Sequence, residues 1–210
     1  MATALMDGRV RPPEVLFDEF VSDRPDGEVW ELIDGQRIMQ AKPSIAHQVL
    51  AGNVERLLND APEAERARLA VQATTIDMSE GDGGRYVPDV AVVDADEECM
   101  TRNVSTRCYL AVEVVSPSDR RRVADDLTKI EEKVKGYRLL PSCNAILLID
   151  QDRFEAEIHL RRLGQWVASE LTSPDDALEI PGFGLRCTLA DIYDRTPALK
   201  AALQRVPSGR

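Results

Sequence analysis

Three short runs of almost uninterrupted apolar residues constrain the fold of this chain more than any other feature. The runs span residues 87–93, 109–115 and 145–149. Each has the length of a strand, and a strand that is apolar along its whole length is normally covered on both faces of its sheet. Helices would supply that cover. The sequence therefore predicts an α/β fold in which a mixed β-sheet is flanked by helices.

Apolar residues recur at helical spacing in two longer segments. The first spans residues 44–59, where Ser44 is a suitable N-cap. The second spans residues 121–139, and its predicted core face holds Val123, Leu127, Ile130, Val134 and Tyr137. Shorter helices are expected at residues 15–21, at residues 189–193 and from Thr196 onward.

Two β-hairpins are predicted, one near each end of the sheet-forming region. The N-terminal hairpin covers residues 28–39 and turns at Asp34-Gly35, a favoured pair for a two-residue turn. The C-terminal hairpin pairs residues 155–161 with residues 166–171. Polar and apolar residues alternate in its first strand, which indicates a half-exposed or edge strand. One further strand is predicted at residues 71–78.

The length of 210 residues suits one α/β domain and is short for two. We expect a flexible arm over residues 1–14, a single domain over residues 15–195, and a C-terminal tail with a short helix over residues 196–210. No apolar run is long enough to cross a bilayer and no signal-peptide core is present, so a cytoplasmic location is expected. Four cysteines without a CxxC pair, and only two histidines, argue against structural zinc.

Two carboxylates inside the apolar runs carry the clearest chemical signal. Asp89 follows Val87-Pro88, and Glu113 lies between Val112 and Val114. A carboxylate in a strand covered on both faces loses solvent, which costs several kcal/mol unless its charge is paired. Two such acids on nearby strands would raise each other's pKa unless a cation lies between them. A hard divalent ion such as Mg²⁺ suits carboxylate oxygen, so the residues predict a metal site. The alternative is that Asp89 caps a turn and Glu113 pairs with an arginine.

The formal net charge of −11 counts against a protein that coats nucleic acid non-specifically. An acidic chain can still carry a local basic surface. Its expected source is the run Arg120-Arg121-Arg122, continued by Lys129, Lys133 and Lys135. The alternative for such a charge run is an ordinary solvated helix face.

The order of these motifs resembles that of the PD-(D/E)XK phosphodiesterase superfamily and, within it, the Uma-type family of restriction endonucleases. The resemblance extends from about Phe17 to Tyr193. Its landmarks are Trp30-Glu31-Leu32-Ile33-Asp34-Gly35, His47-Gln48, Val87-Pro88-Asp89-Val90, Val112-Glu113-Val114-Val115-Ser116-Pro117-Ser118, residues 133–137 and Leu147-Leu148-Ile149-Asp150. Pro-Asp alone is a weak motif, whereas the ordered set is fairly specific. The resemblance implies a restriction-endonuclease-like fold.

The resemblance also implies a catalytic centre. Asp89 and Glu113 match the metal ligands of the family. The lysine of the superfamily usually stands two residues after the glutamate, where this chain has Val115. In the Uma-type family the lysine lies on the following helix, and Lys133 matches it. Lys133 would position or activate the attacking water; the alternative is a solvated lysine on an exposed helix face.

Two further residues are implied as part of the site. Glu31 aligns with a helper acid of the family, and its alternative is an ordinary hairpin carboxylate. His47 would be a proton donor or a close neighbour of the site, and its alternative is a histidine that only packs. Ser116 would contact phosphate or simply cap the turn at Pro117.

The implied activity is hydrolysis of phosphodiester bonds, most directly in DNA, by a Mg²⁺-dependent endonuclease in which Mn²⁺ can substitute. One alternative is a catalytically weak or inactive nuclease fold that binds nucleic acid or a protein complex. The missing strand lysine and the acidic composition favour it. Another is an enzyme acting on a small phosphorylated metabolite, although no Gly-rich phosphate loop supports this. A homodimer without membrane contact is expected, because cleavage of both strands needs two sites.

Overall fold

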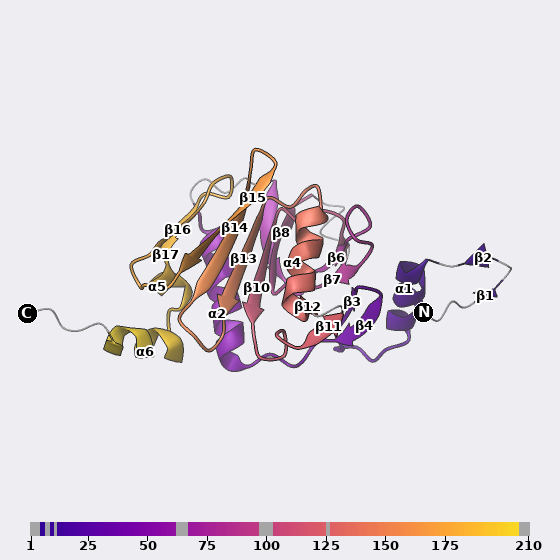
Figure 1. Cartoon of the computed structure of the whole chain (residues 1–210), viewed down its shortest axis with the longest axis horizontal. Coiled ribbons are helices and arrows are strands. Elements are labelled where there is room, and N and C mark those ends of the chain that lie inside the picture. The colour runs from indigo at the N-terminus through magenta and orange to yellow at the C-terminus, as the bar shows by residue number, and fades with distance from the viewer. Residues whose placement is uncertain are drawn as a thin grey trace, which may run out of the picture.

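The helices of the chain are α1 (Pro13–Ser22), α2 (Ile45–Asn59), α4 (Lys129–Leu139), α5 (Leu189–Ile192) and α6 (Pro197–Arg205), as Figure 1 shows. The structure is a computed structural model that describes residues 5–6, 9–10, 12–61, 67–96, 103–124 and 127–205. None of the helices within these residues is long and apolar enough to cross a bilayer. Half of the predicted arm at residues 1–14 lies outside the described residues, and Cys99 lies outside them as well.

A six-stranded mixed sheet forms the centre of the fold and confirms the predicted fold class. Its order is β15 (Gln165–Leu171), β14 (Ala156–Arg162), β13 (Ala145–Asp150), β10 (Leu110–Val115), β8 (Val90–Asp94) and β5 (Arg68–Gln72). Strands β10 and β13 are parallel, with Glu113 opposite Leu148, and α4 connects them. The other neighbours in this sheet are antiparallel.

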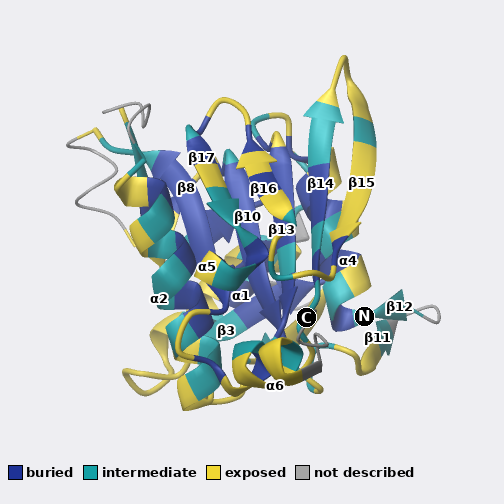
Figure 2. Cartoon of the chain, turned by 90° about the vertical axis from the view of Figure 1, so that its left-hand side faces the viewer, coloured by how far each residue is buried: buried dark blue, intermediate teal, exposed yellow. Residues whose placement is uncertain are grey.

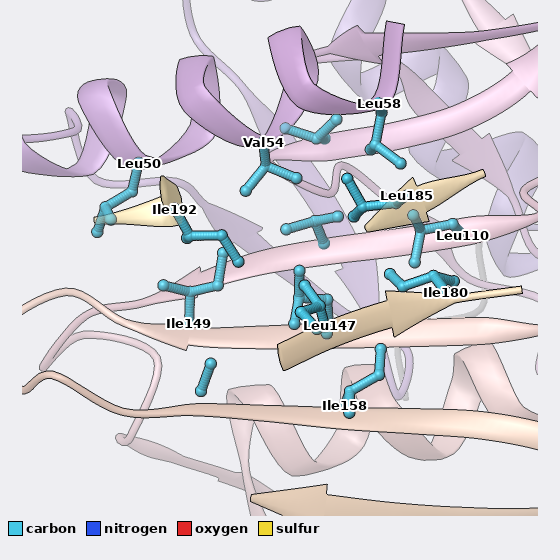
Figure 3. Packing of buried hydrophobic residues seen from close by; sticks show 14 of the residues in the cluster. Leu50, Val54, Leu58, Leu110, Leu147, Ile149, Ile158, Ile180, Leu185 and Ile192 are labelled. Atoms are coloured by element: carbon cyan, nitrogen blue, oxygen red, sulfur yellow. The ribbon is translucent and has the colours of Figure 1, made fainter. Parts of the chain in front are cut away.

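The two faces of this sheet are covered by different elements. Side chains of β10 alternate between them, so Leu110, Val112 and Val114 pack with α2 and α5 in one apolar cluster. Figure 3 shows this cluster, in which Leu50 and Ile192 lie over the sheet. Residues on the opposite side of β10 pack with α4 and the second sheet in another cluster. By the same alternation, Glu113 faces α4.

A second sheet of five strands lies beside the central one. Its order is β4 (Gln36–Met39), β3 (Trp30–Ile33), β7 (Arg85–Tyr86), β6 (Thr75–Asp77) and β9 (Val104–Ser105). Strands β3 and β4 form the predicted N-terminal hairpin, with Asp34 and Gly35 at positive φ in its turn. Three two-stranded ribbons complete the fold: β1 (Leu5–Met6) with β2 (Arg9–Val10), β11 (Arg122–Ala124) with β12 (Leu127–Thr128), and β16 (Ala177–Ile180) with β17 (Leu185–Thr188).

The prediction of one continuous strand at residues 71–78 is wrong. The chain forms β5 and then β6, which belong to different sheets. Between them Ala73 adopts a φ of 54°, a left-handed conformation that ends an extended strand. The predicted strand at residues 87–93 is also too long. It begins at Val90, because Pro88 has no N–H for a sheet and Asp89 lies at a bend between β7 and β8.

The predicted helix at residues 121–139 is wrong at its start and in its buried face. Residues 122–124 and 127–128 form the β11–β12 ribbon, and α4 begins only at Lys129. Thr128 caps it in a capping box with Glu131. The buried residues of α4 are Lys129, Glu132, Lys133, Gly136 and Tyr137, so Tyr137 alone of the predicted core face is buried.

The C-terminal hairpin forms as predicted, but its position in the sheet differs. Strand β14 lies inside the sheet and β15 is the edge strand, which is mostly exposed in Figure 2. The β16–β17 ribbon was not predicted, since its four-residue strands are too short for a clear alternation. It packs Ile180 and Leu185 onto the central sheet beside α2.

Candidate functional site

A pocket of about 210 Å³ lies where the loop after β4, the N-terminus of α2, the C-terminal end of β10 and the start of α4 meet. Its polar lining includes His47, Asp89, Glu113, Asp119, Lys129 and Gln151. These side chains come from segments far apart in the sequence. The carboxyl ends of the parallel strands β10 and β13 bring two of these segments together, as is common for ligand sites in α/β folds.

Asp89 is fixed in this pocket by the backbone of β10. The Val114 N–H donates a hydrogen bond of 2.7 Å to Asp89 Oδ2. The same oxygen lies 3.3 Å from His47 Nε2, and the carboxylate is about one-fifth exposed. Within the described residues no hydrogen bond reaches Asp89 Oδ1. The carboxylate therefore has one oxygen held by protein and one available to a ligand.

Glu113 is also held through one oxygen only, in this case by two side chains of α4. The Tyr137 hydroxyl donates to Glu113 Oε1 at 2.6 Å, and Lys133 Nζ lies 2.6 Å from the same oxygen. Burial raises the pKa of Glu113 to about 7, with Lys133 opposing this shift and the Asp89 charge adding to it. No described residue donates a hydrogen bond to Glu113 Oε2. Its second oxygen is therefore also uncommitted.

Glu31 lies behind these two acids and is fully buried. Its Oε1 accepts a hydrogen bond of 2.9 Å from the Val87 N–H and lies 2.8 Å from Lys133 Nζ, while its Oε2 lies 2.8 Å from Lys129 Nζ. Burial raises the pKa of Glu31, but the two ammonium groups outweigh burial, and the resulting pKa lies below the usual range. Glu31 is therefore a charged internal partner that anchors both lysines of α4.

Lys133 is sealed inside the protein, with a side chain only 1 % exposed. Its Nζ is surrounded by Glu31 Oε1, Glu113 Oε1 and, at 3.2 Å, the Val87 carbonyl oxygen. Burial lowers the pKa of Lys133, but the neighbouring carboxylates of Glu113 and Glu31 more than offset burial and raise it. Lys133 thus reaches Glu113 as predicted, yet it is not among the described residues that line the pocket.

Lys129 lies one helical turn earlier on the same face and does line the pocket. Its side chain is 11 % exposed, and its Nζ lies 3.3 Å from Asp119 Oδ1. Asp119 is fixed by Ser116, whose N–H and Oγ donate to Asp119 Oδ2 at 2.9 and 2.6 Å. Burial raises the pKa of Asp119, but Lys129 and the Ser116 hydrogen bonds lower it overall.

His47 stands in the first turn of α2, where Ser44 caps the helix as predicted. Its side chain is mostly buried and contacts Asp89. Burial lowers the pKa of His47, but the hydrogen bond and the charge of Asp89 outweigh burial and raise it. The side chain lies in the pocket beside Asp89, and therefore not in an apolar packing position.

The structure brings all five predicted site residues, Glu31, His47, Asp89, Glu113 and Lys133, into one connected cluster. No described arginine pairs with Asp89 or Glu113. The expected basic surface is wrong in part, because Lys129 and Lys133 are buried in ion pairs. Ser116 caps a turn by a hydrogen bond to Asp119. Within the described residues, its side chain is hydrogen-bonded to one further side chain, that of Ser118.

Sequence reasoning missed several residues of the pocket, among them Lys42, Asp119, Lys129 and Gln151. Lys129 was expected only on a basic surface, and Asp119 and Gln151 were not expected at all. Gln151 directly follows β13, and Asp119 lies four residues after β10. Both follow the carboxyl ends of adjacent parallel strands, which is the signal that could have found them.

The donor set fits a small hard cation held mainly by carboxylates. No group of three His, Cys, Asp or Glu side chains in the described part of the chain is arranged as a metal cage. Asp89 and Glu113 nevertheless offer one free oxygen each into the same pocket. Mg²⁺ is commonly bound through one or two carboxylates and keeps several waters, whereas structural zinc needs four protein ligands.

Comparison with known proteins relates this chain to one family and to one solved structure. The family profile Uma2, described as "Putative restriction endonuclease", matches residues 17–190. A crystal structure from Anabaena variabilis ATCC 29413, described as a putative nuclease belonging to DUF820, superposes with a TM-score of 0.66 and 18 % sequence identity. The match covers 84 % of this chain and 96 % of that one, so the two share a fold. No curated protein matches the chain.

Proposed function

The chain belongs to the Uma2 family of putative restriction endonucleases, and we propose that it is a metal-dependent endonuclease that hydrolyses phosphodiester bonds in DNA. The nuclease name of the family and the similarity in fold to a nuclease support this class of activity. The metal is Mg²⁺, with Mn²⁺ as a substitute, and the metal ligands are Asp89 and Glu113.

One observation carries the proposal. Asp89 and Glu113 place one uncommitted carboxylate oxygen each in a single pocket, while their other oxygens are fixed by protein groups. Fixed carboxylates that share a small pocket repel each other unless a cation lies between them. Burial raises the pKa of Glu113 to about 7 and the charge of Asp89 adds to this shift, so a cation beside both carboxylates would stabilise their charged forms.

The charge balance of the cluster supports a divalent ion. The cluster contains these ionisable groups: Glu31, Asp89, Glu113, Asp119, Lys129 and Lys133. Counted without His47 and Lys42, which also line the pocket, four carboxylates against two ammonium groups leave an excess of two negative charges when all are ionised. One Mg²⁺ ion neutralises this excess without any further side chain.

The residues around the ligands hold them and bind the substrate. Tyr137 and Lys133 orient Glu113, and the backbone of Val114 and His47 orient Asp89. A bound cation supplies positive charge that polarises the phosphodiester and stabilises the charge that develops on it. The N-terminus of α2 also opens into the pocket at Ser44, and its free backbone N–H groups favour an anion.

The proposal is tested by cleavage of supercoiled plasmid DNA with the purified protein. We expect nicking in Mg²⁺ or Mn²⁺, none with EDTA, and recovery when the metal is restored. Asp89→Asn is expected to reduce the rate to background, whereas Asp175→Asn, which changes an exposed residue outside the pocket, keeps it. Equal rates for wild type and Asp89→Asn would contradict the assignment.

The competing candidate is a nuclease fold that binds nucleic acid without cutting it. Val115, which stands where the superfamily usually has its lysine, is an apolar and buried residue, and this favours the candidate. Binding of DNA in Mg²⁺ without cleavage under any tested condition would support it. The homodimer proposed for cleavage of both strands is checked separately by light scattering.

A further inference from the structure

Two lysines on the same face of α4, Lys129 and Lys133, contact the same buried carboxylate but differ in their access to the pocket. We propose that, of the two lysines of α4, Lys129 and not Lys133 contacts the phosphate group of the substrate. This inference rests on the proposed nuclease function and names the residue that binds the reacting group.

The surroundings of Lys133 leave it no free donor. An ammonium group has three N–H bonds. Three oxygen atoms lie within 3.2 Å of Lys133 Nζ, from Glu31, Glu113 and the Val87 backbone. The side chain is 1 % exposed, so a phosphate oxygen would have to displace one of these partners inside the protein. Its position suits a group that holds Glu113 in place.

The surroundings of Lys129 are different. Two carboxylate oxygens lie near its Nζ, at 2.8 Å from Glu31 and 3.3 Å from Asp119. These two contacts engage at most two of the three N–H bonds of the ammonium group, and no described residue provides a third acceptor. At least one N–H of Lys129 is therefore available, and the side chain lines the pocket together with Asp89 and Glu113.

The negative charge of the pocket explains why a free N–H of Lys129 would help to bind a phosphate. Asp89, Glu113 and Asp119 line it with negative charge, which repels a phosphodiester. Lys129 is a positively charged side chain that reaches the same space from a rigid helix, held by Glu31 from behind. It would donate a hydrogen bond to a non-bridging phosphate oxygen and orient the phosphate beside the two carboxylates. The ammonium keeps its proton throughout.

Binding measurements separate this role from a structural one. The probe is a fluorescent 16-base-pair DNA duplex with Ca²⁺ in place of Mg²⁺, and its affinity is measured over a range of KCl concentrations. Each phosphate contact contributes about 0.9 to the slope of log K against log salt. We expect Lys129→Met to lower this slope by about 0.9 and Lys129→Arg to keep it.

One variant serves as the control. Lys200→Met removes an exposed lysine of α6 outside the pocket, and the folded protein keeps the wild-type slope. If Lys129→Met does not fold, the slope of Asp119→Asn is compared with that of the double variant Asp119→Asn/Lys129→Met. The double variant also removes the charge of Asp119, which Lys129 balances in the wild type.

The outcomes distinguish this inference from the proposed function. A wild-type slope in folded Lys129→Met, or an equally lowered slope in Lys200→Met, overturns the role of Lys129. If the wild-type protein binds the duplex but never cleaves DNA, and Lys129→Met lowers the slope of log K against log salt, the role of Lys129 is supported and the nuclease proposal fails. A wild-type protein that binds no duplex overturns both.

Discussion

The backbone N–H of Val114 holds Asp89 by a hydrogen bond of 2.7 Å to its Oδ2 atom. Val114 directly follows Glu113, so this bond ties the carboxylate of one segment to the strand that carries the other. Asp89 lies at a bend before β8, where its side chain is not committed to the alternation of a strand. The two acids are therefore brought together by backbone geometry as well as by charge.

Gly136 is predicted to be indispensable to the placement of α4. A Cβ at this position would lie 2.4 Å from the Tyr86 hydroxyl and 2.6 Å from Asp82 Oδ2. Gly136→Ala is expected to destabilise the protein by about 1–3 kcal/mol despite the better helix propensity of alanine, because the helix must move. Urea unfolding measures this. Gly52→Ala in α2 is the matched control: nothing lies within 4 Å of its Cβ, so about 0.5–1 kcal/mol of stabilisation is expected. Stabilisation of both variants would contradict the predicted contact.

Glu31 is predicted to stabilise the fold through its two lysines. Glu31→Gln leaves Lys129 and Lys133 short of one buried countercharge, a change that typically costs about 3–5 kcal/mol. Glu28→Gln alters an exposed carboxylate beside the same hairpin that accepts a hydrogen bond from Trp30, and should cost less than about 1 kcal/mol. Urea midpoints at neutral pH compare the two. Similar losses for both variants would show that the buried charge is not needed.

His159 is predicted to make stability depend on acid pH. Burial and the nearby Arg138 lower its pKa from 6.5 to about 4, and Arg138 Nη2 lies 2.8 Å from its Nδ1. The unfolded chain binds a proton near pH 6.5, whereas the folded chain does not until about pH 4. Stability from this group is therefore complete above pH 6.5, falls as the pH drops toward 4, and changes no further below it. The loss is about 3 kcal/mol at most.

The check for His159 is a difference between two curves. Free energies of unfolding are measured from pH 8 to pH 4 for wild type and His159→Gln. The wild type should lose more stability than the variant across this interval, because glutamine does not titrate. Parallel curves would mean that His159 binds its proton equally in the folded and unfolded chains.

Binding of Mn²⁺ is predicted to raise the melting temperature through Asp89 and Glu113. A ligand at about 100 times its Kd adds about 2.7 kcal/mol, or roughly 5–10 °C for a chain of this size. Asp89→Asn and Glu113→Gln should each abolish the increase, and Asp175→Asn should retain it. Thermal unfolding monitored by circular dichroism measures these shifts. An unchanged increase in Asp89→Asn would place the ion elsewhere.

Much of the fold was predictable because its apolar pattern is strong. The strands β10 and β13 are apolar except for Glu113 and Asp150, and all of their residues but Leu148 are buried, as a strand covered on both faces would be. The start of α4 was not predicted, although Thr128 and Glu131 have the spacing of a capping box. The break at Ala73 could not be predicted, because alanine rarely adopts positive φ and carries no signal for it.

The candidate site was predictable only in part, because the apolar pattern reveals some of its residues and not others. Carboxylates inside apolar runs stand out, so Asp89 and Glu113 were found from the residues. The buried face of α4 was not, because a search for apolar periodicity assumes an apolar core. Here the buried face holds Lys129 and Lys133, whose charges are balanced by carboxylates from other elements. Such partners are distant in the sequence and become visible only in the fold.

The most direct measurement is a crystal soaked in Mn²⁺ with diffraction data collected at the manganese absorption edge. The account predicts one strong anomalous peak in the pocket, within bonding distance of Asp89 Oδ1 and Glu113 Oε2. An empty pocket at a Mn²⁺ concentration that shifts the melting temperature, or a peak bound by other residues alone, would contradict it.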